Sequence, residues 1–389
     1  MIRPSTVACI TLLVPCAVVA QQGAPDTTRT APPAATSASP ISLDFSGTLF
    51  ANFQYRGDSG VLKSQNKFDV ERAYLTFRMP AGDRASVRIT ADVFQQNTAP
   101  NDSFYRGWVI RAKYAYLQYD LIKRAGWGAN IRGGILQNVV IDHIESFWPR
   151  WLSLSPLERA GFFASSDVGV ATLWTFPGKW GELYATIVNG PGYTSHETDR
   201  FKDYAARISI TPLSNVRNKV WSTLAVTGWT YDGAIGSSFA AGGTGQVGPV
   251  GSALPRTRAG VFVGVRDPRL AAGLEFDARR DGSESGANTA ASPRVESDSS
   301  GRLIAGFASV KPFQLRDQSS RFPLGVVARW DRFTPNTASA GVVNTIIAGL
   351  TWDLNKKVSV SADYQEQTPH APATSPRART YFFHLVANF

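Results

Sequence analysis

Apolar and polar residues alternate along most of the chain from Ile41 onward. Between residues 43 and 55, every odd position is apolar or glycine, whereas most even positions are polar. The same alternation recurs at 84–93 and at 358–365. Because successive side chains of a β-strand point to opposite faces, this period of two predicts amphipathic strands.

Sixteen segments follow this pattern, although the register is ambiguous at 168–176 and 220–231. Their lengths suit the roughly 9–11 residues of a tilted strand that crosses a membrane. The predicted strands are 41–56, 68–79, 84–96, 108–121, 127–136, 168–176, 182–189, 203–211, 220–231, 258–266, 270–281, 301–311, 323–332, 342–353, 358–366 and 379–389.

The connections between these segments alternate between short and long; only the link at 312–322 is longer than its place predicts. This alternation predicts an all-β fold: a transmembrane antiparallel β-barrel of about 16 strands, with short periplasmic turns and long extracellular loops. A soluble β-sandwich or solenoid is the less favoured alternative. The short connections are 80–83, 122–126, 177–181, 212–218, 267–268 and 354–357, and the long ones are 57–67, 97–107, 137–167, 190–202, 232–257, 282–300, 333–341 and 367–378.

Residues 1–20 have the pattern of a secretory signal peptide, with one basic residue followed by an apolar stretch. We expect cleavage before Gln21. Lipidation at Cys16 is an alternative, but the proline before it fits a lipidation site badly. Since Cys9 and Cys16 both lie in this segment, the mature chain has no disulfide and no thiolate metal site.

Residues 21–40 are rich in Gln, Pro, Thr, Ala and Ser. They contain too little apolar surface to fold, which predicts a disordered periplasmic lead-in. The barrel is therefore expected over residues 41–389.

Composition agrees with a barrel that has aromatic girdles at both membrane interfaces. The chain contains 34 Gly, 22 Phe, 12 Tyr and 10 Trp, an unusual mixture for a helical enzyme. Its formal net charge is +10. That surplus fits either an anion-attracting lumen or contacts with anionic lipopolysaccharide, and charge alone does not decide between them.

The last predicted strand carries an apolar face from Tyr381 to the terminal Phe389. A final strand that ends in an aromatic residue resembles the signal recognised by the barrel assembly machinery of the outer membrane. An ordinary amphipathic strand that happens to stop there is the simpler alternative.

Several motifs, taken in order and spacing, resemble the phosphate-selective porin O and P family over most of the mature chain. The resemblance implies a homotrimeric, sixteen-stranded passive channel that in some members selects phosphate. One departure concerns 133–140, which lacks the family's proline-containing turn, so selectivity is not carried over. The motifs are Val-Asn-Gly-Pro-Gly at 188–192, Lys-Asp-Tyr-Ala-Ala-Arg-Ile-Ser-Ile-Thr-Pro at 202–212, and the passages at 68–75, 158–170, 328–331 and 348–355.

If the apolar faces point outward, the charged residues of the strands line the lumen. A basic wall opposite an acidic wall would set up a transverse field that orients ions. Alternatively, these charges pair with one another and only keep the wall polar. The predicted pore-lining or anion-binding residues are Arg72, Arg78, Arg84, Arg88, Arg132, Arg207 and Arg329, and the predicted opposing acidic residues are Asp44, Asp331, Asp353 and Asp363.

The longest connection, 137–167, is too rich in Ile and Trp for a loop in solvent. We therefore predict that it folds into the lumen and narrows it. Packing over a rim or at a subunit contact is the alternative. Its charged candidates for a constriction are Asp142, His143, Glu145, Arg150, Glu158 and Arg159.

Other classes of protein find less support. The chain has four histidines, none in a recognisable Ser-His-Asp setting, and no Gly-x-Ser-x-Gly motif, so a barrel-embedded hydrolase is a weak alternative. A metal site at 142–145 lacks a second histidine, and no cofactor motif is present. A plugged 22-stranded receptor needs a longer chain.

A structural or adhesive barrel that does not conduct ions is a further alternative. The expected partners are small hydrophilic or anionic solutes and outer-membrane lipid with lipopolysaccharide, without nucleic acid.

Overall fold

The computed structural model describes residues 42–58, 63–96, 107–197, 199–236, 251–287, 289–370 and 377–389. The predicted signal peptide and the predicted lead-in lie outside the described residues. Among the described helices, none combines the length and the apolar character of a membrane-spanning helix.

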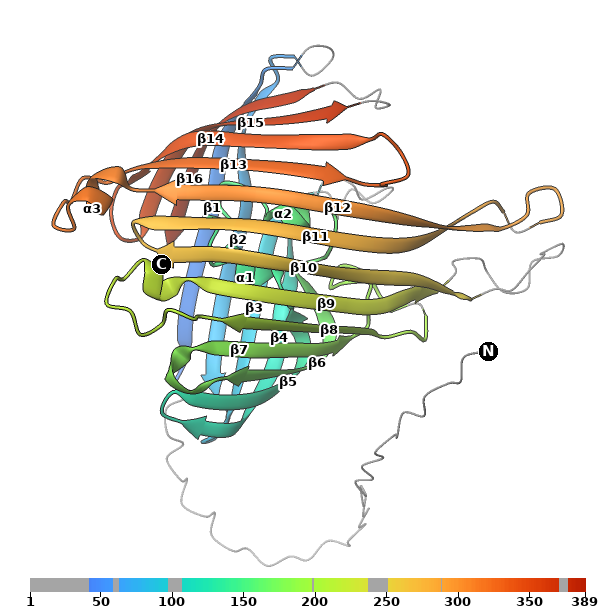
Figure 1. The fold of residues 1–389 in the computed structure, drawn as a ribbon, viewed down its shortest axis with the longest axis horizontal. Helices are drawn as coiled ribbons and strands as arrows, with labels where there is room; N and C mark the ends of the chain where they lie inside the picture. The colour runs from blue at the N-terminus through green and yellow to red at the C-terminus, as the bar shows by residue number, and fades with distance from the viewer. Residues whose placement is uncertain are drawn as a thin grey trace, which may run out of the picture. The chain divides into compact units, whose positions relative to one another are not determined.

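Sixteen antiparallel strands form a closed barrel, in which each strand pairs with its neighbours in sequence and β1 pairs with β16 (Figure 1). The predicted sixteen-stranded antiparallel β-barrel is therefore confirmed. The strands are β1 (Asp44–Arg56), β2 (Asn66–Pro80), β3 (Ala85–Gln96), β4 (Gly107–Arg124), β5 (Trp127–Gln137), β6 (Ser166–Thr175), β7 (Gly181–Val188), β8 (Asp203–Ile210), β9 (Ala225–Gly236), β10 (Ala253–Asp267), β11 (Leu270–Ser285), β12 (Val295–Val310), β13 (Leu324–Thr334), β14 (Val342–Asp353), β15 (Val358–His370) and β16 (Ala378–Asn388).

Five short helical segments lie in the described parts of the connections. Helices α1 (Ile141–Glu145) and α2 (Pro156–Arg159) belong to the connection between β5 and β6, whereas α3 (Pro312–Arg316) joins β12 to β13. Single 3₁₀ turns, η2 (Pro177–Lys179) and η3 (Trp221–Thr223), precede β7 and β9. We call the barrel end that carries α3 and the two 3₁₀ turns the short-turn rim, and the other end the long-loop rim.

Two groups of strand boundaries differ from the prediction. β9 begins at Ala225 rather than at 220, because the Asn218 side chain accepts hydrogen bonds from the backbone N–H groups of Val220 and Trp221 and starts η3 instead. β10 and β12 begin earlier than predicted and, with β11, extend beyond their neighbours (Figure 1). The extension of β12 is polar on both faces after Val295, and that of β10 contains Pro255, so no regular hydrophobic alternation marks them.

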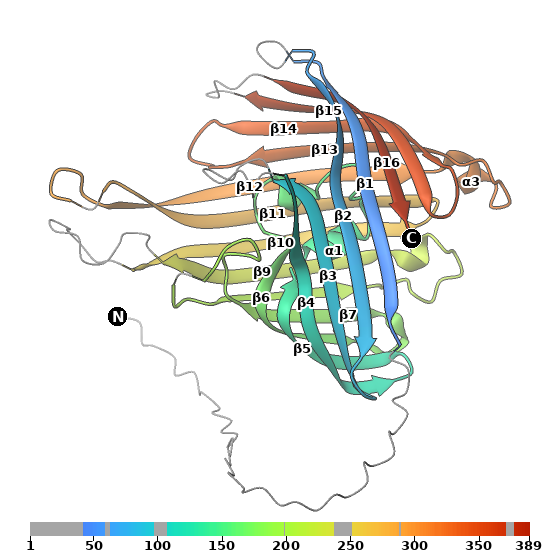
Figure 2. The same ribbon diagram turned by 180° about the vertical axis from the view of Figure 1, so that it is seen from behind.

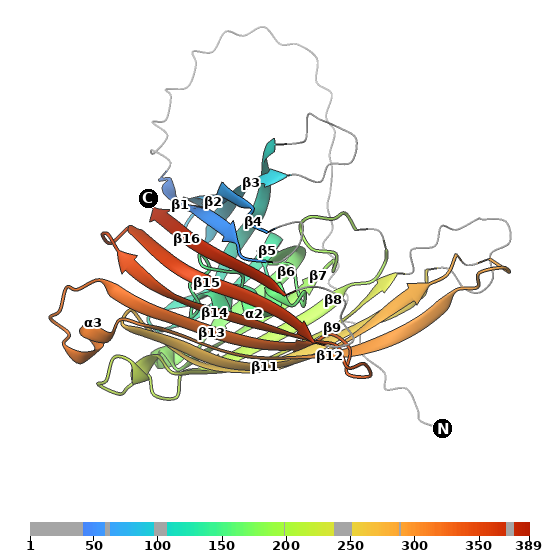
Figure 3. The same ribbon diagram turned by 90° about the horizontal axis from the view of Figure 1, so that it is seen from above.

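The barrel walls alternate between outward apolar and inward polar residues, as the period of two predicts. On β13, for example, Val326 and Trp330 are exposed on the outer surface, while Arg329 and Asp331 between and beside them are buried inside. Strands β1–β4 lie across the barrel from β10–β12, with α1 and α2 between the two walls (Figures 2 and 3).

The seam between the first and last strands is closed by the terminal residue. The ring of Phe389 lies over Gly47, where any Cβ atom would collide with it. The ring also lies near Phe45, at 6.1 Å between centroids, and Phe45 in turn contacts Phe77 at 5.1 Å. A glycine that accepts an aromatic ring from the adjacent strand is a known device for pinning strand register.

We expect Gly47→Ala to destabilise the barrel by roughly 1–3 kcal/mol, the usual cost of overpacking a filled site. The temperature at which the folded barrel converts to the slower-migrating unfolded band on a gel should fall. Gly228→Ala is the matched control, because a Cβ at Gly228 meets no atom within 4 Å. Equal losses in both variants would contradict the importance of the Phe389 contact.

Candidate functional site

The connection 137–167, which we call the inserted loop, lies inside the barrel. Its helices α1 and α2 appear between the front and back walls in two opposite views (Figures 1 and 2). Its own side chains are almost fully buried: the exposed fraction is at most 1% for Ile141, Ile144, Trp148, Leu157 and Phe162. The loop therefore has a packed apolar core, as its Ile and Trp content predicts.

This core packs against an apolar patch on the lumenal wall. The ring of Phe147 contacts Phe262 of β10 at 4.8 Å, and Trp148 contacts Phe307 of β12 at 5.4 Å. The patch continues through further buried side chains on β12, β13 and β14, which are Leu303, Ala305, Val327 and Ile347. Apolar residues therefore do not all point outward, which corrects the simplest reading of the alternation.

Polar contacts fasten the far part of the loop to the strands near the seam. Gln365 on β15 donates to the carbonyl oxygen of Leu152 at 2.9 Å, and Arg329 on β13 donates to that of Leu154. Arg159 in the loop donates to Gln365 at 3.1 Å. The loop is thus held at both its apolar and its polar ends.

Arg150 ties the loop to β2. Its guanidinium lies 3.1 Å from Glu71 of β2, 3.1 Å from Glu145 and 3.9 Å from Glu158. Only 9% of Arg150 is exposed, so these charges act on one another with little solvent between them. Removing one partner of such a buried group leaves an uncompensated charge, typically at a cost of about 3–5 kcal/mol.

The remaining loop candidates bind different partners. Asp142 accepts from Tyr114 at 2.7 Å and from Gln137 at 2.9 Å. His143 lies 2.8 Å from the guanidinium of Arg207 and 2.9 Å from the Thr227 hydroxyl. Burial lowers the pKa of His143 well below its ordinary value, and Arg207 adds to that shift.

A metal ion fits this arrangement poorly, because Asp142, His143 and Glu145 each contact different partners and do not converge on one point. Among the described residues, no group of three or more ligating side chains could hold a metal ion.

The structure places the predicted arginines in three settings. Arg72, Arg88, Arg132, Arg207 and Arg329 carry lumen-facing side chains, while Arg78 and Arg84 lie at the short-turn rim and are exposed. Of the lumenal group, three have a carboxylate partner: Arg72 with Asp92, Arg207 with Glu182, and Arg329 with Asp331.

Arg88 and Arg132 differ from these three, because their partners are neutral. Arg88 donates to the Thr90 hydroxyl at 3.2 Å and lies 4.7 Å from the ring centre of Tyr114. Arg132 donates to the side-chain oxygens of Gln118, Asn130 and Gln137, at 3.0, 3.1 and 3.1 Å. Within the residues that the structure describes, neither guanidinium has a carboxylate within 4.0 Å.

The predicted acidic residues do not form one continuous wall. Asp331 is paired with Arg329 on its own strand, and Asp363 lies 3.3 Å from His384. Asp353, bound to Lys311, and Asp44, near Arg78, lie at the short-turn rim. The lumen therefore mixes the two signs of charge instead of separating them.

Sequence reasoning missed several lumenal residues. Arg111 on β4 contacts Asp92 at 3.0 Å and lies 4.0 Å from the ring centre of Phe94. Lys113 is buried beside Tyr74. A bulge in β4 opposite Thr90 brings both Lys113 and the following residue to the inner face, which a strict period of two does not reveal.

Two further acids, Glu275 and Asp277 on β11, are buried behind the inserted loop with exposed fractions of 4% and 0%. The side-chain oxygens of both residues have no hydrogen-bond partner within the described structure. They alternate with apolar neighbours, and this pattern alone could have indicated an inward charged row.

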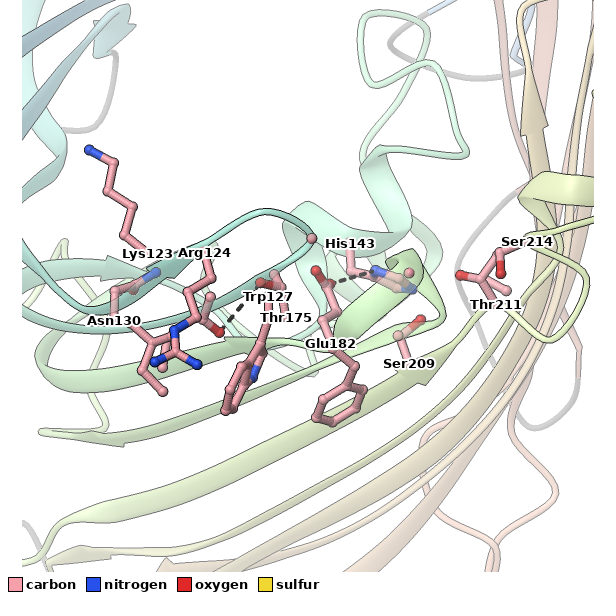
Figure 4. A pocket seen from close by; sticks show the side chains of 18 of the residues that line it. Lys123, Arg124, Trp127, Asn130, His143, Thr175, Glu182, Ser209, Thr211 and Ser214 are labelled. Carbon is pink, nitrogen blue, oxygen red and sulfur yellow. Dashed lines mark hydrogen bonds and ion pairs between the residues drawn. The ribbon is translucent and has the colours of Figure 1, made fainter.

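A cavity of about 750 Å³ opens at the short-turn rim below α1. Lys123, Arg124 and Arg266 line it together with Glu182 and His143, and the last two point toward one another (Figure 4). Asp120 is the other carboxylate in the lining. The three basic side chains therefore outnumber the two acidic ones around this cavity.

The closed sixteen-stranded antiparallel barrel matches the fold of outer-membrane porins. The chain is similar to an anion-selective porin from Comamonas acidovorans, with 9% identity, a TM-score of 0.61, and coverage of 90% of this chain and 100% of that one. Salmonella typhi OmpF, solved with daunomycin, gives 12% identity, a TM-score of 0.58, and coverage of 89% and 97%.

The outer membrane channel DcaP of Acinetobacter baumannii is also similar, with 12% identity, a TM-score of 0.54, and coverage of 90% and 97%. At these identities the likeness shows the fold alone. No family model and no curated protein matches the chain. The resemblance to the phosphate-selective family therefore stays a prediction.

A pH dependence follows from Glu145. Burial raises its pKa from the ordinary 4.5 to about 7, although Lys113 and Arg150 act in the opposite direction. Between these two values the folded chain binds more protons than the unfolded chain, so stability falls as the pH rises through that window. This contribution should lower the unfolding temperature from pH 5 to pH 7 and then level off. The lowered pKa of His143 acts in the opposite direction over part of this range, so the slope due to Glu145 is measured as the difference between the unmodified protein and Glu145→Gln.

Glu145→Gln should remove most of this slope, because the amide does not ionise. Glu158→Gln, which alters another carboxylate beside Arg150, is the control and should keep it. An unchanged slope in Glu145→Gln would assign the pH dependence to another group.

Proposed function

We propose that this protein is an outer-membrane porin: a passive, water-filled channel for small hydrophilic solutes, with a preference for anions such as phosphate. The fold supports the channel, since its solved structural neighbours are mainly porins. An enzymatic role is not part of this proposal.

The observation that carries the anion preference is the pair Arg88 and Arg132. Each holds a full positive charge at the lumenal surface, with only neutral hydrogen-bond partners in the described structure. The electric field of a guanidinium with neutral partners extends into the lumen. When a carboxylate pairs with the guanidinium, its negative charge cancels most of that field. Placement of these two charges, rather than the net charge of the chain, supports the preference.

The proposal includes the surroundings of a porin. The exposed apolar belt would contact outer-membrane lipid and lipopolysaccharide, and the strand that ends at Phe389 would be read by the barrel assembly machinery. A homotrimer and membership of the phosphate-selective family are further parts of the proposal. They rest on the motifs in the sequence.

A non-conducting structural barrel is the second candidate. One observation favours it: the inserted loop is fastened to β2, β10, β12, β13 and β15, so that it fills much of the interior. The two candidates differ in a single measurable property, the passage of ions.

Single-channel recording in planar bilayers tests the proposal. With mature protein in a KCl gradient, we expect stepwise openings, a reversal potential on the anion side, and a lower chloride current when phosphate is added. Openings without anion bias would support the porin function but reject the anion preference. A folded barrel that never conducts would favour the structural candidate.

The variant Arg88→Gln with Arg132→Gln should reduce the anion-to-cation permeability ratio by about fivefold for each charge removed. A unit positive charge about 8 Å away through water attracts an anion and repels a cation by about 0.5 kcal/mol each, so the two ions differ by about 1 kcal/mol, which gives this factor. Arg332→Gln is the matched control, since Arg332 lies on the outer face of β13 and is exposed. An equal effect in the control would show that the two lumenal arginines do not set the selectivity.

A further inference from the structure

Three cavities follow one another along the inner face of β5–β9. The first is the cavity of about 750 Å³ at the short-turn rim. The second, of about 240 Å³, lies higher, between the start of the inserted loop and the side chains of Arg132, Tyr184 and Arg207. The third, of about 30 Å³, lies toward the long-loop rim, beside Thr186 and Arg256.

Adjacent cavities share the residues that line them. The first and second cavities both contact His143, Glu182 and Arg266. The second and third both contact Gln137, Asn138 and Val139. Space inside the barrel is therefore arranged as a series that runs from one rim toward the other beside the first residues of the inserted loop.

The opposite side of the loop is closed by direct contacts. Arg150 meets Glu71 of β2, Leu152 accepts from Gln365 of β15, and the Trp151 ring lies 6.2 Å from that of His384 on β16.

We propose that solutes cross the barrel along β5–β9, between this wall and loop residues 138–143, rather than along β1–β3 or β14–β16. The inference rests on the proposed channel function and adds the route. Its narrowest part is the third cavity, where Val139 of the loop faces the wall. A cavity of about 30 Å³ has room for a few water molecules at most.

The chemistry of this route favours small anions. Arg132 and Arg266 line the second cavity and have only neutral hydrogen-bond partners in the described structure, Arg266 donating to the Ser146 hydroxyl at 2.9 Å. The charge of Arg207 is offset by Glu182, at 2.7 Å. Asp142 also lines this cavity and accepts from the neutral side chains of Tyr114 and Gln137, so the lining carries one more positive than negative charge. This surplus lies next to the third cavity, whose small volume limits the size of the solute.

Enlarging the narrow part tests the route. Val139→Ala should raise the single-channel conductance by about twofold, because it adds two methyl-sized volumes to the smallest of the three cavities. Val386→Ala is the matched control: it is the same substitution at a buried lumenal residue of β16, and it should leave the conductance unchanged. An increase in Val386→Ala alone, or no increase in either, would overturn the inferred route.

Chemical labelling gives a second, independent readout. The cysteines of the chain are at positions 9 and 16 only, so a mature chain from residue 21 starts without a thiol. Thr186→Cys on β7 and Thr380→Cys on β16 form a matched pair, since the two threonines are lumenal and exposed by 6% and 7%. Both would be treated with an anionic methanethiosulfonate during recording, and the label would then be measured by mass spectrometry.

We expect Thr186→Cys to be labelled and its current to fall, and Thr380→Cys to keep its current. A permeating anion on this route must pass position 186, so a conducting channel without label there would overturn the inference. A loss of current when Thr380→Cys is labelled would place the route on the β16 side of the loop and would also overturn the inference. If the unmodified protein does not conduct at all, the proposed channel function itself fails, and this outcome is distinct from the other two.

Discussion

The packing of the inserted loop against the inner face of β10 and β12–β14 is the contact on which the rest of the lumen depends. Phe147 and Trp148 bury their rings against Phe262 and Phe307, and this fixes the position of α1 relative to the wall. Full burial of such side chains contributes roughly 1.5–3 kcal/mol each. The charged residues of the loop reach their partners only because this apolar contact holds the backbone in place.

The same contact makes the interior asymmetric. One side of the loop is occupied by apolar rings and by backbone carbonyls that accept from Arg329 and Gln365. On the other side polar groups and cavities remain, with Arg132 and Arg207 facing the space beneath Asn138. A barrel of uniform strands thus acquires a dense half and an open half through one insertion.

Much of the fold could be predicted from the sequence, because barrel strands repeat one simple rule. All sixteen predicted strands correspond to strands of the structure, and the insertion of 137–167 follows from its apolar content. The rule fails where side chains on both faces are alike. On β12, Ile304 points outward and Leu303 inward, so hydrophobicity does not separate the faces.

The lumenal charges were harder to predict, since their effect depends on partners that are distant in sequence. Arg329 pairs with Asp331 two positions away, which the sequence could have indicated, whereas Arg72 pairs with Asp92 and Arg207 with Glu182, each on another strand. A bulge such as the one at Lys113 also shifts the parity on which the prediction depends.

The seam has a consequence for assembly. Thr48 and Asn388, which hydrogen-bond across it, are separated by 340 positions in the chain. Contacts between such remote residues form slowly, and this one cannot form before β16 has joined the sheet. The inserted loop, whose apolar partners Phe262 and Phe307 lie on β10 and β12, can dock once those strands are in place, which is before β16 arrives. Closure would then seal a barrel around an interior that is already filled, so an error in loop placement would be trapped rather than corrected.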